Sequence, residues 1–382
     1  MRLTRILATS AGAVLLVLVL FGTAPAGNQT LKVGIFAGGY IGNWQKKGYQ
    51  LAFSTLKNGS FSIQPVYVGC ADNPYWVRKT VKRLSRGKVV AFIGGSSSKC
   101  TSFLAGVSQR HKIPLISPFS PMELLSRFGF EYVFRLNAPI RWYIDTLLNY
   151  AVNRSHRPET IGFIYEASPF GRRFTDFAED RARSLKLKVI ANENVDFADK
   201  GRKAADKVIK VKPEVLMIVG NQEDGLRILR WLKEANYKPK VLLGAGAGFS
   251  MPSFLKAQQG AAEGLVTVTQ WYPSVPWPQA KGFVDAFKKR YETEPNYLSA
   301  EAYAATQVLF DAMKRANCTG GFLVCRESLK KALIDTNMET VFGPVNFADF
   351  RGYTNQNPHK LLIMQVKEGK LQIVSPPDTT SN

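Results

Sequence analysis

The strongest restriction on the fold of this chain is a regular alternation of short apolar segments with longer amphipathic ones. Runs rich in β-branched and aromatic residues, such as residues 31–38 and 89–95, end in glycine and precede ten or more residues with helical spacing. Strands separated by helices of this length form a parallel sheet with helices on both faces. The expected strands are 31–38, 61–68, 89–95 and 113–117 and, after the pattern restarts, 132–136, 160–166, 187–195, 213–220, 239–246 and 265–271.

Two such series predict two α/β domains in a chain of 382 residues, because each series is long enough for a domain. The last third of the chain has a different pattern. Residues 278–292 and 299–316 have the spacing of long helices. Residues 359–376 are expected to form a hairpin with Glu368 and Gly369 at its turn.

The first 26 residues have the organisation of a secretory signal peptide. Met1–Arg5 carries two positive side chains, the 16 residues of Ile6–Phe21 carry none, and Ala24-Pro25-Ala26 follows as a small-residue cleavage pattern. An uncleaved membrane anchor is the alternative, but the apolar run is shorter than the roughly 20 residues that span a bilayer. No cysteine lies near the cleavage site, so a lipid anchor is not expected. Cleavage after Ala26 would place the mature chain outside the cytoplasm.

The cysteines fit an exported chain. Cys70, Cys100, Cys318 and Cys325 are an even set, which favours disulfides in an oxidising compartment, although four cysteines allow three pairings. Cys318 and Cys325 are close in sequence and flank a Gly-Gly turn, which makes them natural partners and leaves Cys70 with Cys100. A zinc site is the alternative, but the chain has no CxxC spacing and only three histidines. Disulfides, and no metal, are expected.

The chain is strongly basic. Its formal charge is +22, and loss of Arg2 and Arg5 with the signal segment lowers this to +20. A field of that sign attracts anions, acidic membrane surfaces or nucleic acid. The basic runs are dispersed over amphipathic segments, however, and lack the interleaved aromatic residues on which bases stack. Solvated helix faces are the simpler explanation, and no nucleic-acid partner is expected.

Small and hydroxyl-bearing residues follow two consecutive strands. Gly94–Ser98 opens a helix after one strand, and Ser117–Pro121 follows the next. The free N–H groups of a helix N-terminus, with serine hydroxyls beside them, suit a carboxylate or a phosphate. Simple capping of the helix is the alternative for the first junction taken alone. Because consecutive strand ends lie side by side in a doubly wound sheet, the two junctions together predict a crevice that binds an anionic group.

Catalytic motifs are absent from the sequence. There is no GxSxG elbow, HExxH pair or P-loop. Gly244–Gly248 resembles half of a dinucleotide-binding loop but lacks the full spacing, so no cofactor is expected. His111, His156 and His359 show no motif with a serine, which makes an exported hydrolase the weaker alternative. A binding function without catalysis is predicted.

Several stretches stand in an order that is characteristic of one family. They are KVVAFIGGSSS, IPLISPFSPMELL, EYVFRLNAP, TIGFIYEASPFGRRF, VLMIVGNQEDGLRILRWLKEANYKPKVLLG and AEAYAATQVLFDAMKRA with FGPVNFADFRG. In this order the mature chain resembles the type I periplasmic solute-binding proteins of ABC transporters, in particular the leucine/isoleucine/valine-binding group. The resemblance implies an α/β fold of two doubly wound parallel-sheet lobes joined by a three-strand hinge, with the ligand in the cleft between the lobes.

The resemblance also implies domain limits. Lobe 1 would comprise residues 31–136 and 270–346, and lobe 2 would comprise residues 138–268 and 350–374. The chain would cross between the lobes near 136–139, 267–272 and 345–352.

Site residues carry over by position. The family's ligand contacts lie on strand ends and first helical turns of both lobes. The matching positions are Tyr40, Trp44, Ser97, Ser98, Phe119, Ser120, Phe170, Gln222 and Gly246. In the family a cluster of hydroxyls and N–H groups on lobe 1 holds the ligand carboxylate, so the GGSSS stretch would be one jaw of the cleft.

One position departs from the family pattern and bears on the solute. In amino-acid binders an acidic residue that pairs with the ligand ammonium often follows the strand that here includes VLLGAGAG, and the matching position is Gly246. Burying an unpaired ammonium costs several kcal/mol. Either another acid serves, such as Glu223 or Asp224, or the solute has no ammonium.

The resemblance therefore implies a monomeric periplasmic protein that captures a small carboxylate-bearing solute and delivers it to an ABC permease in the inner membrane. An amino acid of the branched-chain type is the first choice. Two alternatives stay open. The solute is an aromatic or aliphatic carboxylate or amide instead, or the protein is a sensing subunit that reports its ligand to a membrane receptor kinase.

Overall fold

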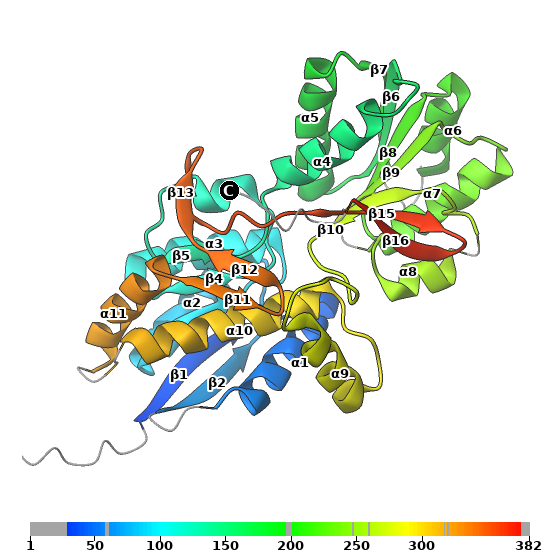
Figure 1. Cartoon of the computed structure of the whole chain (residues 1–382). Helices are drawn as coiled ribbons and strands as arrows, with labels where there is room; N and C mark the ends of the chain where they lie inside the picture. The colour runs from blue at the N-terminus through cyan, green and yellow to red at the C-terminus, as the bar shows by residue number, and fades with distance from the viewer. Residues whose placement is uncertain are drawn as a thin grey trace, which may run out of the picture.

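The computed structural model describes residues 29–57, 61–195, 201–246, 248–258, 260–316, 318 and 321–375. The expected signal peptide at 1–26 lies outside the described residues. The described residues form two α/β lobes, with the blue and cyan segments in lobe 1 and the green segments in lobe 2 (Figure 1). Among the described helices, none combines the length and the apolar character needed to cross a bilayer.

The lobe 1 sheet has the strand order β13-β14-β5-β4-β3-β1-β2. Its strands are β1 (Gln29–Phe36), β2 (Phe61–Val68), β3 (Val89–Gly94), β4 (Leu115–Ser117), β5 (Val133–Arg135), β13 (Ala348–Phe350) and β14 (Tyr353–Gln356). Neighbouring strands are parallel except for β13 with β14. β3 is buried along its whole length, as its unbroken apolar sequence requires in a sheet covered on both faces.

Helices cover both faces of this sheet. They are α1 (Gly39–Thr55), α2 (Pro74–Arg86), α3 (Ser98–His111), α9 (Ala280–Tyr291), α10 (Tyr297–Ala316) and α11 (Phe322–Ile334), with a short 3-10 turn, η1 (Glu123–Ser126). α2 and α3 pack with Phe92 on one face, whereas α1 and α10 pack with its neighbour Ile93 on the other. α1 and α10 approach closely at Gly48, where an added Cβ would lie 2.2 Å from the carbonyl oxygen of Ser299.

The lobe 2 sheet has the order β16-β15-β10-β9-β8-β6-β7. Its strands are β6 (Thr160–Glu166), β7 (Lys188–Val195), β8 (Val215–Val219), β9 (Val241–Ala245), β10 (Val266–Thr269), β15 (Leu362–Lys367) and β16 (Lys370–Ser375). Its helices are α4 (Ile140–Val152), α5 (Pro169–Ser184), α6 (Gly201–Val211), α7 (Gln222–Glu234) and α8 (Pro252–Ala257). β15 and β16 form the expected hairpin, and Glu368 and Gly369 at its turn both have positive φ.

In both lobes the strand order reverses at the first strand of the series. β1 lies between β2 and β3, and β6 lies between β7 and β8. This is the doubly wound arrangement, so the expected fold class is confirmed. A separate hairpin of β11 (Asn337–Thr340) and β12 (Gly343–Asn346) belongs to neither sheet.

The chain passes between the lobes three times, at residues 136–139, 270–279 and 357–361. The third crossing differs from the expectation of 345–352. β13 and β14 still belong to the lobe 1 sheet, so lobe 2 resumes only at β15 and not at residue 350. The reason is that β14 pairs with β5, with Gln356 opposite Arg135, before the chain leaves the lobe.

The three crossing segments are hydrogen-bonded to one another. The side-chain amide of Asn357 donates to the carbonyl of Leu136 (3.0 Å), and the N–H of Ala138 donates to the side-chain oxygen of Gln270 (2.8 Å). Burial lowers the pKa of His359 to about 4, so its imidazole is neutral, and its Nε2–H donates to the carbonyl of Gln270 (2.7 Å). The hinge is therefore a single hydrogen-bonded unit.

Both expected disulfides are present. Cys70 is bonded to Cys100 and Cys318 to Cys325, at sequence separations of 30 and 7. The first joins the segment after β2 to the first turn of α3. The second joins Cys318 to the first turn of α11.

Candidate functional site

A cavity of about 400 Å³ lies between the two lobes at the carboxyl ends of both sheets. Lobe 1 contributes Ile41 after β1 and Ser96–Ser98 after β3, and lobe 2 contributes Glu166 at the end of β6 and Gly220 after β8. Doubly wound sheets bind their ligands where the strand order reverses. The cavity lies at that point in both sheets at once.

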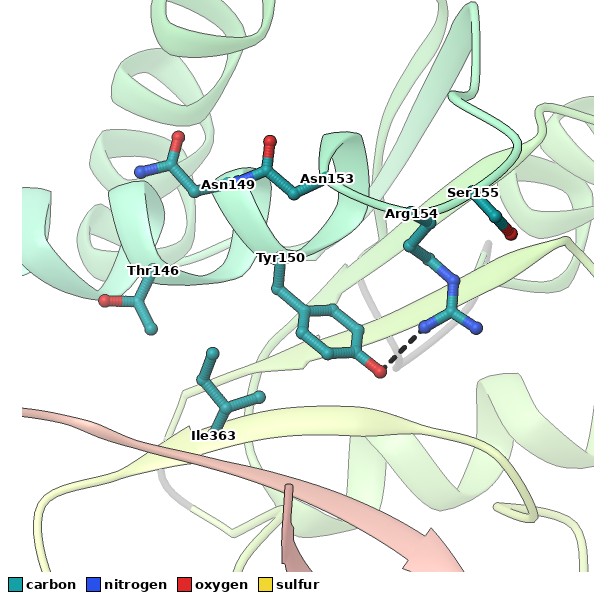
Figure 2. A pocket seen from close by; sticks show the side chains of 7 residues that line it. All are labelled: Thr146, Asn149, Tyr150, Asn153, Arg154, Ser155 and Ile363. Atoms are coloured by element: carbon teal, nitrogen blue, oxygen red, sulfur yellow. Dashed lines mark hydrogen bonds between the residues drawn. The ribbon is translucent and has the colours of Figure 1, made fainter. Parts of the chain in front are cut away.

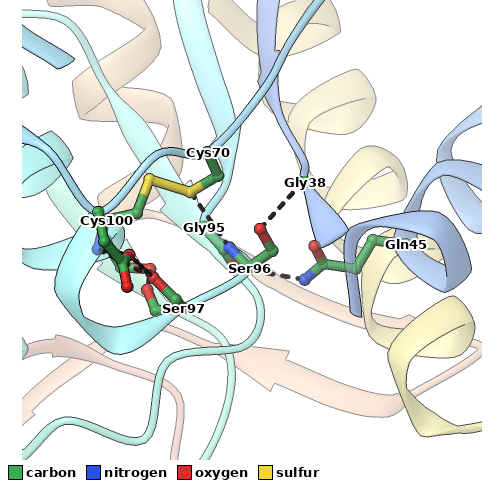
Figure 3. Close-up of a disulfide and its surroundings, with 9 residues drawn as sticks. Gly38, Gln45, Cys70, Gly95, Ser96, Ser97 and Cys100 are labelled. Atoms are coloured by element: carbon green, nitrogen blue, oxygen red, sulfur yellow. Dashed lines mark hydrogen bonds between the residues drawn. A yellow bond between two sulfur atoms is a disulfide. The ribbon is translucent and has the colours of Figure 1, made fainter. Parts of the chain in front are cut away.

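The lobe 1 wall is the turn between β3 and α3, which the disulfide Cys70–Cys100 holds beside the end of β2 (Figure 3). The hydroxyl of Ser96 accepts a hydrogen bond from the N–H of Gly38 at 3.0 Å, and the N–H of Ser96 is directed at the sulfur of Cys70 at 3.4 Å. The turn is therefore fixed to the ends of β1, which neighbours β3, and of β2, the next strand beyond it.

Within this turn, Ser97 and Ser98 have different roles. Ser97 is the N-cap of α3, and its hydroxyl accepts from the N–H of Cys100 at 3.0 Å and donates to the carboxylate of Asp72. Among the described residues the hydroxyl of Ser98 has no hydrogen-bond partner, and Ser98 lines the cavity. Ser98 and the first N–H groups of α3 are the donors that remain for a ligand.

The lobe 2 wall carries two carboxylates around the backbone of Gly220. A Cβ added at Gly220 would lie 3.4 Å from Oδ2 of Asp224 and 3.5 Å from Oε2 of Glu166. Glu166 lines the cavity, and its other oxygen accepts from the hydroxyl of Ser168. Burial, with the nearby charge of Glu166, raises the pKa of Asp224 to about 6. The pair is a site of negative potential that a cationic group would relieve.

The position at which the family has an acid must be glycine in this chain. Gly246 has a φ of +120°, and an added Cβ would lie 2.3 Å from the carbonyl oxygen of Gly220. The ends of β8 and β9 thus approach too closely for any side chain at residue 246. Glu166 and Asp224 flank the same Gly220, so the negative charge of this wall comes from β6 and α7.

The remaining surface of the cavity is largely aromatic. Phe119 and Tyr297 come from lobe 1, and Tyr143, Phe170 and Phe174 come from lobe 2. Phe170 and Phe174 lie one helical turn apart on α5, with ring centroids 5.8 Å apart. Within the described lining, Glu166 is the one charged side chain.

The structure brings five of the nine expected contacts to this cavity: Ser97, Ser98, Phe119, Phe170 and Gly246. A wider cavity of about 710 Å³ opens toward the same crevice and includes Tyr40, Gln222 and again Ser97. Tyr40 is 58% exposed, and Gln222 accepts a hydrogen bond from Ser253 at 2.6 Å.

Two expected contacts lie elsewhere. Ser120 is 0% exposed and does not line either cavity, and among the described residues its hydroxyl has no partner. Trp44 lies on the face of α1 that packs on α9, where its ring stacks on Phe287 with centroids 6.5 Å apart and Lys47 lies 4.7 Å above it.

Glu166 was not expected from the sequence. Its place depends on β6 and β8 being neighbours in the sheet, with Tyr165 opposite Val219, and these residues are far apart in the chain. An acid at the very end of the first strand of a doubly wound series was the available signal, because that strand borders the point where the order reverses.

A buried carboxyl lies behind the cavity. Glu301 on α10 is 0% exposed, and neither oxygen has a partner among the described residues. Tyr297, one turn earlier, and Tyr143 line the cavity in front of it, and both lie close enough to interact with it electrostatically. Burial raises the pKa of Glu301 well above its usual range, so the protonated form of this carboxyl is favoured in the folded protein.

Another cavity, of about 530 Å³, lies on the outside of lobe 2 between α4 and β15 (Figure 2). Its wall includes Thr146, Asn149 and Asn153, and Arg154 donates to the hydroxyl of Tyr150 at 2.8 Å. It is remote from the points where the strand orders reverse. Within the described ranges, no three His, Cys, Asp or Glu side chains come together as a metal site would require.

Known proteins share both the sequence pattern and the fold. The sequence profile of the family described as periplasmic binding protein matches residues 29–370. The Leu/Ile/Val-binding protein homolog 7 of Brucella melitensis biotype 1 is 24% identical over 94% of each chain.

Among solved structures, the leucine-binding protein LivK from Thermotoga maritima has a TM-score of 0.78 at 21% identity, covering 92% of this chain and 100% of that one. An ABC-transporter solute-binding protein from R. palustris, solved with benzoate, has a TM-score of 0.76 at 19% identity, covering 90% of this chain and 95% of that one. Both are described as binding proteins.

The family profile spans nearly all of the described α/β body, and the cavity lies where two lobes of this kind face each other. This chain belongs to the periplasmic binding protein family, as a type I member of the leucine/isoleucine/valine-binding kind.

Proposed function

We propose that this chain is an extracytoplasmic solute-binding protein of an ABC transporter that captures a small zwitterionic solute, an amino acid of the branched-chain type, between its lobes. The observation that carries the proposal is the opposition of hydroxyl and N–H donors on lobe 1 to a carboxylate pair on lobe 2. Ser98 lies at the start of α3, and Glu166 lies at the end of β6. A volume of about 400 Å³ suits a small solute.

In this arrangement each end of the solute meets one lobe. The carboxylate accepts hydrogen bonds from the hydroxyl of Ser98 and from the first N–H groups of α3, which a helix N-terminus presents to anions. The ammonium binds the carboxylate of Glu166, and Asp224 lies near that carboxylate. The aliphatic side chain packs among Phe119, Phe170 and Phe174. A solute that bridges both lobes stabilises the closed state, and that state is the one delivered to the membrane permease.

A specific observation favours a second candidate. Five aromatic rings line the cavity, as expected for an aromatic carboxylate such as the benzoate bound by the R. palustris protein. Such a solute leaves Glu166 without a cationic partner and brings a second negative charge into a confined space. The amino acid is therefore preferred.

The test is calorimetric titration with leucine and three analogues. Isocaproate lacks the ammonium, isoamylamine lacks the carboxylate, and benzoate is the aromatic alternative. Leucine is expected to bind at least tenfold more tightly than any of them, because only it satisfies both walls. Tighter binding of isocaproate or benzoate would overturn the amino-acid assignment in favour of a plain carboxylate.

The matched variant is Glu166→Gln, which keeps the size of the side chain and removes its charge. Leucine affinity is expected to fall by about tenfold or more, since a charge-assisted hydrogen bond is lost. Isocaproate affinity is expected to stay the same or to rise. An equal loss for both solutes would show that residue 166 acts on folding and not on the ammonium. Uptake of labelled leucine, compared in cells with and without the chain, distinguishes delivery to a transporter from sensing. Delivery predicts that uptake falls when the chain is absent.

A further inference from the structure

One face of lobe 1 has an unusual charge distribution. Residues 73–122 contain nine Lys and Arg residues and no Asp or Glu. Arg78, Lys79, Lys82, Arg83, Arg86 and Lys88 lie on α2 or directly after it, and Lys99, Arg110 and Lys112 lie on or directly after α3. All nine are exposed, and we call them the basic face.

The two helices that carry the basic face are adjacent. α2 and α3 pack together on one face of the lobe 1 sheet, and their apolar sides share a core cluster with Phe92. Their outer sides are therefore one continuous surface. Burial, with the charges of Arg326 on α11 and of Arg110 and Lys82, lowers the pKa of His111 at the end of α3. Lys82 belongs to α2, so cations of both helices act on the same point.

The basic face lacks ion pairs. Some cations on other helices of lobe 1 do form them, as in Lys281 with Asp285 at 2.8 Å and Arg315 with Asp311 at 2.7 Å. Among the described residues, no cation of the basic face forms an ion pair. Nine like charges without ion-pair partners repel one another, and an external polyanion would relieve that repulsion.

We propose that the basic face docks the protein on an anionic phospholipid surface. Tyr75 is 68% exposed and Trp76 half-buried at the start of α2, beside the cations. Tyrosine and tryptophan are the residues that settle at the headgroup level of a bilayer. Exposed Lys and Arg are attracted to anionic lipids within about one Debye length, roughly 8 Å at 0.15 M salt. The helices bury their apolar sides in the lobe, so the association is peripheral and reversible.

Nucleic acid fits the same surface less well. Single strands require several exposed rings on which bases stack, and the cations of α2 and α3 are not interleaved with such rings along the helices. The basic face extends along both helices. Arg86, Lys88, Arg110 and Lys112 lie at or just after the carboxyl ends, away from the cavity at the amino end of α3, whereas Tyr75, Trp76 and Lys99 lie at the amino ends. The proposal does not depend on which solute the cavity takes.

The experiment is cosedimentation of the purified protein with vesicles of phosphatidylcholine alone or of an equal mixture with phosphatidylglycerol. Binding is expected to the mixed vesicles only and is expected to weaken by tenfold or more between about 0.05 M and 0.3 M salt. Absence of binding to the mixed vesicles, or binding that salt does not change, would overturn the proposal.

A matched pair of variants tests the location. Reversing Arg78, Lys79 and Lys82 to glutamate is expected to reduce vesicle binding by about tenfold or more. Reversing Lys203, Lys210 and Lys233 on lobe 2 changes the net charge equally and is expected to have little effect, because these exposed lysines lie outside the basic face. Unchanged circular dichroism and melting temperature show that both variants fold.

Three results contradict the proposal. Equal losses in the two variants would mean that net charge, and not this face, determines binding. No loss in the first variant would place the contact elsewhere. Tighter binding to duplex DNA than to the mixed vesicles at the same salt would assign the face to nucleic acid.

Discussion

The hydroxyl of Ser97 donates its hydrogen bond to the carboxylate of Asp72, which also receives the N–H of Cys100 at 3.2 Å. Asp72 thus places a negative charge at the N-terminus of α3, where a solute carboxylate would bind. The positive end of the helix dipole is partly neutralised within lobe 1 itself.

The substitution Asp72→Asn is therefore expected to strengthen binding of carboxylate solutes by about two- to fivefold, the usual effect of one charge at a helix N-terminus. The amide oxygen of asparagine still accepts from Ser97 or Cys100, so the turn keeps its shape. Titration calorimetry with leucine measures the gain, and isoamylamine, which has no carboxylate, is the control. A weaker affinity for leucine would show that Asp72 supports the site and does not compete with it.

Ser98 and Ser120 provide a second comparison. Ser98→Ala removes a hydroxyl that lines the cavity without a partner among the described residues, and leucine affinity is expected to fall by about five- to tenfold. Ser120→Ala removes a hydroxyl that is buried outside both cavities, and affinity is expected to be unchanged. Titration calorimetry with leucine on both variants is the measurement. A loss of leucine affinity in the Ser120 variant alone would assign the ligand contact to Ser120 and not to Ser98.

Binding of an ammonium-bearing solute should depend on pH. Burial and the charge of Glu166 raise the pKa of Asp224 to about 6, so this carboxyl is mostly protonated at pH 5 and ionised at pH 7.5. An ammonium beside Glu166 favours the ionised form and lowers that pKa, so binding releases a proton and strengthens as pH rises toward 6.

Leucine affinity is therefore expected to rise by about three- to tenfold from pH 5 to 7.5 and then level off. Titrations in two buffers of different ionisation enthalpy measure the released proton. The variant Asp224→Asn should abolish the dependence. A leucine affinity that is flat over this range would contradict the placement of the ammonium.

The two disulfides should differ in what they support. Removing Cys70–Cys100 with paired alanines is expected to cost about 3–4 kcal/mol of unfolding free energy, and removing Cys318–Cys325 about 2–3 kcal/mol, because the first closes the longer loop. Only the first holds the turn that carries Ser96–Ser98, so only its loss should also weaken leucine binding. Denaturant unfolding and calorimetry give the two quantities separately, and equal affinities in both variants would contradict this account.

The buried carboxyl of Glu301 should make the protein less stable in base. Its pKa is raised in the folded state, so the folded protein holds a proton that the unfolded chain has lost above about pH 4.5. The contribution of Glu301 to the free energy of unfolding is largest below that pH and decreases as the pH rises above it.

Glu301→Gln imitates the protonated acid and is expected to add about 1–3 kcal/mol at pH 8 and little at pH 4. Thermal unfolding across this range is the measurement. Destabilisation at pH 8 would mean that Glu301 is ionised and paired in the folded protein.

The sheets were predictable because buried parallel strands have continuous apolar sequences, as in Val89–Gly94, and are separated by helices with clear amphipathic spacing. β13 and β14 were not predictable in this way. They are short and polar, and β14 is held by contacts of the buried Arg135 with Gln356, which no local period reveals. The second segment of lobe 2 was therefore expected to begin at residue 350, before its actual start at β15.

At the site, the turn after β3 was predictable from glycines and serines at a strand end. The different roles of Ser97, which caps α3, and Ser98, which lines the cavity, were not. The sequence does not show that Asp72 accepts the hydrogen bond of the Ser97 hydroxyl. Trp44 was misplaced because a helix has several faces, and the tight contact of α1 with α10 turns this side chain toward Phe287. Glu166 depends on a pairing between strands distant in the chain, which a single sequence does not contain.

The hydrogen bonds that join Leu136, Ala138, Gln270, Asn357 and His359 make the three connecting segments move together. The lobes can rotate toward each other only as far as this shared pivot bends, so the separation of Ser98 from Glu166 is set at the pivot. We therefore expect the selectivity of the cavity for solute length to depend in part on Asn357 and His359, neither of which lines the cavity.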